Sequence, residues 1–214
     1  MNSQNILYIF IVLVIFNFLF TTVLDYINDK NWKDEIPDDL KDFYDSSTYL
    51  KAKKYKIERG RLSSISSSLN LIFTVLMLYF YGFGFISDYA ISLSDSVIVQ
   101  SSIFFMIFHL ITYFLGIPFS YYSTFVIEEK FGFNKTDLKT FIIDKIKSLI
   151  MSVILIIGLT SIAVLIIGFF STGFWLLLWI GLSLFMLFLN MFYADLIVPI
   201  FNKLTPLEDG DLRK

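Results

Sequence analysis

Five long apolar runs divide this chain, and all 17 of its Lys and Arg residues lie outside them. The runs cover about residues 6–24, 69–86, 97–121, 149–170 and 174–201. Each is near or above the roughly 18–20 apolar residues that an α-helix needs to cross about 30 Å of hydrocarbon. The sequence therefore predicts an all-α, polytopic membrane protein with five transmembrane helices.

The positions of the basic residues predict which side of the membrane each connection occupies. Residues 25–61 carry nine basic and nine acidic residues, residues 122–148 carry five Lys, and the tail after Phe201 carries the last three cations. The N-terminal tail and the connections 87–96 and 171–173 contain none. Because Lys and Arg concentrate in cytoplasmic connections, we expect the N-terminus outside and the C-terminus in the cytoplasm.

The composition supports a membrane location and excludes several classes of function. Apolar residues make up 56% of the chain, with 25 Phe, and the mean hydropathy is +0.70. A soluble domain of this size has no interior for so many large apolar side chains, so we expect membrane lipid as a partner. The formal net charge of −2 implies no nucleic acid partner. Abundant Lys, Asn, Ile and Phe are typical of an A/T-rich genome and favour a bacterial inner membrane.

The first apolar run is predicted to be a retained helix and not a cleaved signal. No basic residue precedes it, and no small-residue cleavage site follows it. Asn17, Thr21 and Thr22 are its only polar side chains.

Two of the predicted helices should extend beyond the membrane into the cytosol. Ser46 or Ser47 is a suitable N-cap for a helix that continues into the second span. Thr136 is a suitable N-cap for the fourth, with Asp137 in the first turn. The serine-rich stretch 63–68 is predicted to be a small-residue packing surface near the end of a helix.

The chain lacks the common catalytic signatures. It contains no HExxH, GxSxG, Walker or GxGxxG motif, and it has no Cys. Its single histidine, His109, cannot build the His-rich site of a catalytic zinc. We therefore expect neither a catalytic residue nor a metal site within this chain.

A few polar residues inside or beside the spans are nevertheless candidates for a function. His109 is expected either to hydrogen-bond a neighbouring helix or to act as a ligand or proton relay. Asp195, Pro199 and Asn202 would share one face of a regular helix. Asp195 should then either hydrogen-bond the adjoining cytoplasmic segments or line a water-filled cavity, because a carboxylate in hydrocarbon is costly.

Glu128 and Glu129 follow the third span, where Pro118 is expected to disturb the helix. Their simplest interpretation is a pair of solvated charges at the membrane boundary.

Two stretches resemble a known family. Residues 118–136, PFSYYSTFVIEEKFGFNKT, are similar to the third-span boundary of the type I CAAX prenyl proteases. Residues 193–210, YADLIVPIFNKLTPLEDG, resemble the segment that leaves the fifth span of those proteins. A Tyr-x-x-x-Lys-containing helix at Tyr49–Tyr55 fits more loosely. The resemblance covers essentially the whole chain, as the N-terminal membrane portion of the family.

The resemblance implies a part of an integral-membrane zinc metalloendopeptidase. Members enclose a water-filled chamber with seven membrane helices and bind zinc through an HExxH helix and a later Glu. Those groups lie beyond Lys214, so the resemblance implies a domain 1–214 that lacks the catalytic zinc domain and is inactive alone. Its partners would be the missing C-terminal half and a prenylated or membrane-associated peptide or protein substrate. In a eukaryote, the membrane would be that of the endoplasmic reticulum.

The resemblance assigns five residues to the matching motifs as structural or chamber-lining positions, not as catalytic ones: Glu128, Glu129, Asn134, Asp195 and Asn202. It favours the cavity-lining alternative for Asp195 and Asn202. A non-enzymatic membrane scaffold or regulatory module derived from the same family is the alternative function. A small transporter is disfavoured because the spans lack paired intramembrane charges and interrupted half-helices.

Overall fold

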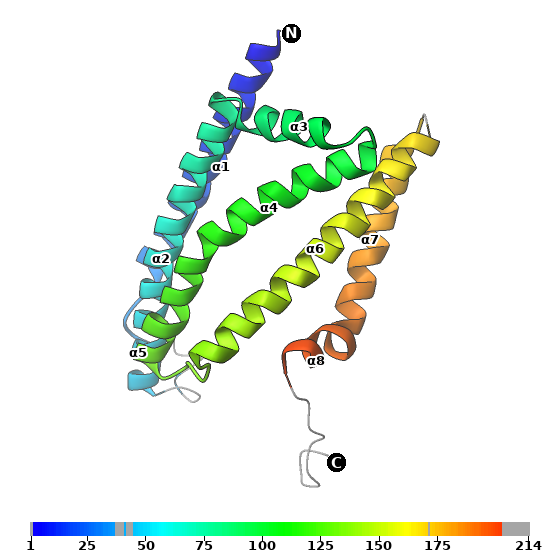
Figure 1. Ribbon diagram of the computed structural model, residues 1–214. Helices are drawn as coiled ribbons and strands as arrows, with labels where there is room; N and C mark the ends of the chain where they lie inside the picture. Colours follow the sequence, from blue (N-terminus) through cyan, green and yellow to red (C-terminus); the bar gives the residue numbers. More distant parts are fainter. Residues whose placement is uncertain (1, 37–40, 42–44, 171, 203–214) are drawn as a thin grey trace. The chain divides into compact units, whose positions relative to one another are not determined.

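The computed structural model describes residues 2–36, 41, 45–170 and 172–202, and the described part consists of helices and the turns between them (Figure 1). Among the described residues, five helices are long and apolar enough to cross a membrane, which confirms the predicted fold class. The predicted cytoplasmic tail, with Lys203, Arg213 and Lys214, lies outside the described residues.

The chain divides into two compact units, each of which is described by itself. The first comprises Met1–Ser92 and Ile107–Thr136, and the second comprises Leu93–Met106 and Asp137–Lys214. The elements, in chain order, are α1 (Ser3–Asn31), α2 (Ser46–Tyr79), α3 (Gly82–Leu93), α4 (Val97–Tyr122), the π-helix η2 (Ser123–Glu128), α5 (Glu129–Phe131), α6 (Leu138–Phe169), α7 (Phe174–Phe192), the π-helix η3 (Tyr193–Ile197) and α8 (Val198–Phe201).

Helices α2 and α6 are longer than a membrane span, as the sequence predicts. They contain 34 and 32 residues. At 1.5 Å per residue each is roughly 50 Å long, against about 30 Å of hydrocarbon. The excess lies at their N-terminal ends, which carry the Lys and Arg residues.

The N-cap of α2 is Asp45, and the prediction of Ser46 or Ser47 was wrong. The Asp45 carboxylate accepts hydrogen bonds from the Thr48 amide at 2.7 Å, the Thr48 hydroxyl at 2.8 Å and the Ser47 hydroxyl at 2.6 Å. A charged acceptor satisfies the free amides of the first turn better than a hydroxyl and suits the helix dipole. The hydrogen bonds from Ser47 and Thr48 hold the pKa of the Asp45 carboxyl well below its usual range.

The N-cap of α6 is Asp137, and the prediction of Thr136 was also wrong. Asp137 Oδ1 accepts a hydrogen bond from the Thr140 amide at 2.7 Å, and the bonds from Thr140 lower the pKa of Asp137. Thr136 belongs to the preceding turn, where its amide donates to Asn134 Oδ1 at 2.8 Å. In both helices a neighbouring Asp is the N-cap in place of the predicted hydroxyl residue.

The second membrane helix ends earlier than predicted. The sequence predicts a span to about residue 86, whereas α2 ends at Tyr79 and α3 begins at Gly82. Tyr81 has a φ of 59°, in the left-handed region that an α-helix cannot continue through. The apolar run conceals this corner because both helices on either side of it are apolar.

The third and fifth spans begin at the predicted positions, Val97 and Phe174, but the third continues to Phe131 and both contain π-helices that the sequence does not predict. Helix α4 runs through Pro118 without ending, and η2 follows directly. Helix α7 continues into η3, which includes Asp195, and then into α8. The regular 100° spacing that placed Asp195, Pro199 and Asn202 on one face does not apply across η3.

The largest fully buried side chain among the described residues of the first unit is Ile127, which is 2% exposed and lies in η2. Phe131 follows it at 7%, and the ring of Tyr55 on α2 packs edge-on against Phe131 and Phe133, with centroids 5.4 and 5.0 Å apart. This small core joins the N-terminal part of α2 to the end of the third span.

In the second unit, Lys147 of α6 secures the end of the fifth span. Its ammonium group donates to the carbonyl of Ile200 at 2.8 Å and lies 5.8 Å from the Phe201 ring centroid. A cation at the C-terminus of a helix satisfies free carbonyls and matches the helix dipole.

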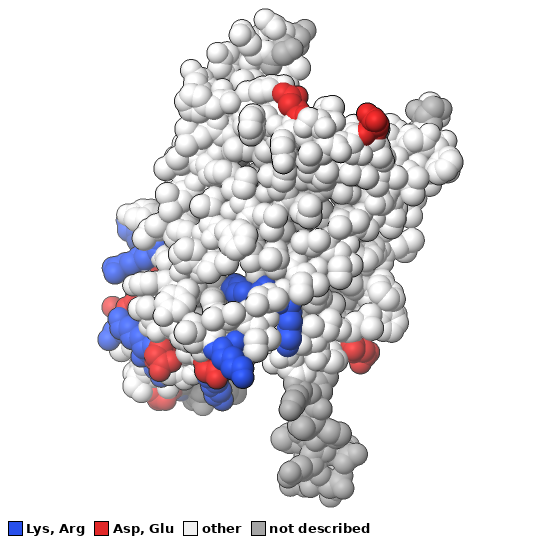
Figure 2. All heavy atoms as spheres, in the orientation of Figure 1, with Lys and Arg blue, Asp and Glu red and all other residues white. Residues whose placement is uncertain are grey.

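The Lys and Arg residues of the first unit gather at one end. On the face shown in Figure 2 they lie where α2 begins and where α5 is located, while the end formed by α3 shows acid and no cation. The wide apolar surface between them contains large exposed side chains, as expected for helices in contact with lipid.

Replacing Ile127 with Ala should destabilise the protein by about 2–5 kcal/mol, because the side chain is fully packed and its removal leaves a cavity. The matched control is Val126→Ala, since Val126 is 42% exposed and its loss should have a much smaller effect. Thermal unfolding in detergent measures both. Equal losses at the two positions would show that η2 has no packed core.

Replacing Asp45 with Ala should increase hydrogen exchange at the start of α2, whereas Asp45→Asn should preserve most of the protection because Asn also caps helices. Since the folded pKa is lowered, the contribution of the carboxylate is complete above the unfolded pKa of about 3.9 and is lost as pH falls through the folded pKa. Wild-type protection should thus persist at about pH 4. Exchange mass spectrometry of the Thr48 region, corrected for intrinsic rates, measures this; early loss would contradict the assignment.

Candidate functional site: a polar groove along the first two membrane helices

Helix α2 carries two stripes of opposite character. Its polar stripe contains Arg59, Ser63, Ser67, Asn70 and Thr74, with spacings of three or four residues. Its exposed apolar stripe, with the same spacings, contains Ile65, Leu69, Ile72, Leu76 and Tyr79. At 3.6 residues per turn the two stripes lie on opposite sides of the helix. One side of α2 therefore suits lipid, and the other requires a polar environment.

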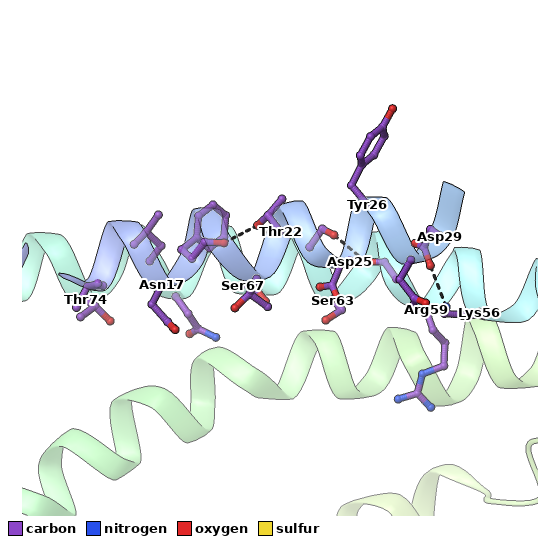
Figure 3. Close-up of a pocket in the computed structure, with 18 of the residues that line it drawn as sticks. Asn17, Thr22, Asp25, Tyr26, Asp29, Lys56, Arg59, Ser63, Ser67 and Thr74 are labelled. Atoms are coloured by element: carbon purple, nitrogen blue, oxygen red, sulfur yellow. Dashed lines mark hydrogen bonds and ion pairs between the residues drawn. The ribbon is translucent and has the colours of Figure 1, made fainter. Parts of the chain in front are cut away.

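Helix α1 carries a matching polar stripe, formed by Asn17, Thr21, Asp25 and Asn28. Together the two helices line an open groove of about 980 Å³. Figure 3 shows the side chains of Asn17, Ser63 and Ser67 on the same side of the paired helices, while Tyr26 points away. Val14, Phe18 and Leu71 supply apolar parts of the wall.

The side-chain amides of Asn17 and Asn70 indicate what the groove can hold. These two amides have no hydrogen-bond partner among the described protein residues. An unpaired amide in an apolar environment costs about 1–3 kcal/mol by protein mutational data. Both residues lie in the apolar portions of their helices. The groove is therefore suited to hold water or another polar molecule at membrane depth.

Ion pairs close the charged end of the groove. Lys56 of α2 lies 3.0 Å from Asp29 of α1, and its ammonium group is 4.6 Å from the Trp32 ring centroid. Arg59 donates to Tyr55 Oη at 3.0 Å and lies 3.3 Å from Glu128 Oε1. The cations that border the groove are thus each paired with a carboxylate.

Glu128 and Glu129 are not merely solvated charges, contrary to their simplest interpretation. Glu128 pairs with Arg59, and the side chain of Glu129 accepts a hydrogen bond from Asn134 Nδ2 at 2.9 Å. A second ion pair joins Lys130 to Glu58 of α2. These contacts attach the segment after the third span to α2.

The turn that follows α5 explains how Glu128, Glu129 and Asn134 come together. Gly132 has a φ of 74°, a left-handed conformation that costs glycine nothing. The amides of Phe133 and Gly132 donate to the carbonyls of Glu128 and Glu129, at 2.8 and 3.0 Å. The chain therefore reverses over its own helix end, and the side chain of Asn134 reaches back to Glu129.

The other predicted residues are not part of this cluster. His109 lies half-buried on α4, with its ring 5.6 Å from that of Tyr113. Asp195, in η3, and Asn202, which follows α8, belong to the second unit, and both are exposed. Their chamber-lining role stays a prediction.

Sequence reasoning missed the groove, although its signal is visible in the sequence. It treated the polar residues of the first span singly and the serine-rich stretch as a packing surface. The 4-4-3 spacing of Asn17, Thr21, Asp25 and Asn28 already predicts a polar stripe on one helix face. Within the described residues, no three His, Cys, Asp or Glu side chains are placed to hold a metal ion.

Comparison with known proteins agrees with the resemblance in the two sequence stretches. Residues 25–203 match the family model described as CAAX prenyl protease N-terminal, five membrane helices. The probable CAAX prenyl protease 1 of Schizosaccharomyces pombe is 34% identical over 195 residues, which cover 85% of this chain and 41% of the relative. The CAAX prenyl protease 1 homolog of Homo sapiens is 31% identical over 186 residues, which cover 84% and 39%.

The similarity extends to a solved structure. The crystal structure of S. mikatae Ste24p superposes with a TM-score of 0.82 at 31% identity, and the match covers 96% of this chain and 50% of that one. The chain thus spans about two-fifths of the length of these curated relatives and half of the crystallised one.

The Arg59–Glu128 pair should contribute about 0.2–1 kcal/mol, because Arg59 is 51% exposed and solvent screens the interaction. A double-mutant cycle with Arg59→Gln and Glu128→Gln, followed by thermal unfolding, measures this coupling, which should weaken as salt is added. The control cycle uses Lys147 and Asp144, which are 3.8 Å apart on one helix and should couple more weakly. A coupling of zero at low salt would contradict the proposed attachment.

Proposed function

Because the chain belongs to the CAAX prenyl protease N-terminal family, we propose that it forms the N-terminal membrane portion of a zinc metalloendopeptidase. In this proposal residues 1–214 supply membrane anchorage and part of the wall of a hydrated intramembrane chamber. The substrate is a prenylated or membrane-associated peptide or protein, and a C-terminal half supplies the catalytic groups.

The polar groove along α1 and α2 is the observation that carries this proposal. Hydrolysis of a peptide within a membrane needs water beside the scissile bond, and hydrocarbon excludes water. Asn17, Ser67 and Asn70 line the groove without filling it and offer hydrogen bonds to water or to a peptide backbone. The apolar stripe lies on the opposite side of α2. In this proposal α2 therefore contacts lipid through the apolar stripe and not through the polar wall of the groove.

The chain's own residues would bind and orient a substrate but would not hydrolyse it. No HExxH is present in residues 1–214, and the described acidic residues and His109 form no metal-binding group. Zinc in the whole protein would polarise the scissile carbonyl and activate water. The described residues do not fit a zinc ion, so the proposed roles of this chain are limited to binding and orienting the substrate.

The remaining candidate residues take supporting roles in the proposal. Glu128, Glu129 and Asn134 hold the end of the third span against α2 at the charged end of the groove. Asp195, Asn202 and His109 are proposed to line the chamber, since polar groups in membrane helices are costly unless they meet water or a partner.

The orientation in the membrane is also part of the proposal. The cation-rich end of the first unit, with the start of α2 and with α5, faces the cytoplasm, as the concentration of Lys and Arg favours. The end formed by α3 faces the other side. The composition of the chain favours a bacterial inner membrane; in a eukaryote, such as the organisms of the relatives in Schizosaccharomyces pombe and Homo sapiens, the membrane would be that of the endoplasmic reticulum.

Single cysteines test the groove directly, because residues 1–214 contain no Cys. In the full-length protein, Ser63→Cys, Ser67→Cys and Asn70→Cys should react with a charged methanethiosulfonate. The adduct should slow cleavage of a prenylated peptide, because it occupies the groove. The matched positions Ile65, Leu69 and Ile72 on the lipid side should not react, and the reagent should leave their cleavage rates unchanged.

The same reagent reports sidedness, since Lys54→Cys should react only from the cytoplasm and Ser96→Cys only from the other side. Unreactive groove positions would overturn the hydrated wall. Reactive groove positions in a full-length protein that cleaves no peptide would favour the scaffold alternative instead.

A further inference from the structure

Helix α3 leaves α2 through a fixed corner. Tyr81 has a φ of 59°, and a Cβ added to Gly82 would lie 2.5 Å from Met77 Sδ, so the chain passes very close to the end of α2. Figure 1 shows α3 running across the end of α2 and not along it. A helix that starts three residues after a membrane span and turns away from it stays near the depth at which the span ended.

One face of α3 packs against the protein. Ile86 is 5% exposed and Ala90 is 1% exposed, and the ring of Phe83 lies 5.4 Å from that of Phe108 on α4. This face fixes the rotation of α3 about its own axis. The directions of its other side chains are therefore set by the 100° advance per residue.

The adjoining side of α3 is aromatic and exposed. Phe85 is 71% exposed and Tyr89 is 51% exposed, and their spacing of four places them on one flank. Asp88 is also exposed and lies on the side away from Ile86 and Ala90. The helix thus has a protein-facing side, an aromatic side and an acidic side.

The aromatic side continues the lipid-facing stripe of α2. That stripe ends with Leu76 and Tyr79, and the chain then presents Phe80 at 70% and Tyr81 at 66% exposure before it reaches Phe85. Large exposed apolar side chains therefore occur in the membrane span, at the corner and on α3. No Lys or Arg occurs between residues 62 and 129.

We propose that α3 is an interfacial helix that lies in the plane of the membrane surface and binds the boundary between lipid headgroups and acyl chains through Phe85 and Tyr89. Phe and Tyr suit this boundary because their rings are apolar, and Tyr also has a hydroxyl that can reach water. The same rotation keeps Asp88 out of hydrocarbon. The interaction is independent of any peptidase activity.

Spin labelling tests the proposal in the full-length protein reconstituted in phosphatidylcholine nanodiscs. Nitroxides on Phe85→Cys, Tyr89→Cys, Asp88→Cys and Leu76→Cys report collisions with O2, which dissolves in lipid, and with a water-soluble nickel chelate. All four residues are exposed, so no label replaces a packed side chain. The ratio of O2 to nickel collisions should be severalfold higher at 85 and 89 than at 88, and should remain below that at 76.

Two outcomes would overturn the proposal. If the labels at 85 and 89 meet the nickel chelate as readily as the label at 88, α3 lies in water. If both reagents are excluded at 85 and 89, another part of the protein covers the aromatic side in place of lipid.

Discussion

The structure depends on the cost of placing an unpaired polar group in hydrocarbon. That cost is about 1–3 kcal/mol for an amide by protein mutational data. A membrane helix that carries a stripe of polar side chains must therefore turn this stripe toward water or polar partners and not toward lipid. Helix α2 meets this requirement with Ser67 and Asn70 on the groove side and Leu69 and Leu76 on the lipid side. The groove is therefore a consequence of the same physics that places the helix in the membrane.

Charged side chains and neutral polar side chains occupy different parts of this chain. The contacts made by charged side chains lie outside the apolar spans: Asp45 and Asp137 cap α2 and α6, Lys147 binds the end of α8, and Arg59 pairs with Glu128. At these sites water screens the charges, and each contact contributes little by itself. Their value lies in fixing the ends of long helices, where the fraying of a helix would otherwise begin.

The length and composition of the apolar runs were enough to predict five membrane helices, because a span needs a minimum number of apolar residues. Local geometry was not predictable in the same way. The corner at Tyr81 lies inside an apolar run, and the caps depended on whether Asp45 or the neighbouring hydroxyls took the free amides. The π-helix at Asp195 changes the side-chain directions on which a face argument relies. The polar stripe of α1 was predictable, but only when its residues were considered together.

The neutral polar side chains of the groove are separated from the charged residues at its end for a physical reason. We call this charged end, with Asp29, Lys56, Arg59 and Glu128, the rim. Asn, Ser and Thr side chains attract water at a modest desolvation cost, whereas an unpaired ion at the same depth would be far more expensive. The cations at the end of the groove are neutralised nearby, Lys56 by Asp29 and Arg59 by Glu128. Apart from the carboxylate of Asp25, a wall of this kind wets the groove without fixing a strong charge along it. It therefore accommodates uncharged peptide backbone through hydrogen bonds and leaves selection by charge to the rim.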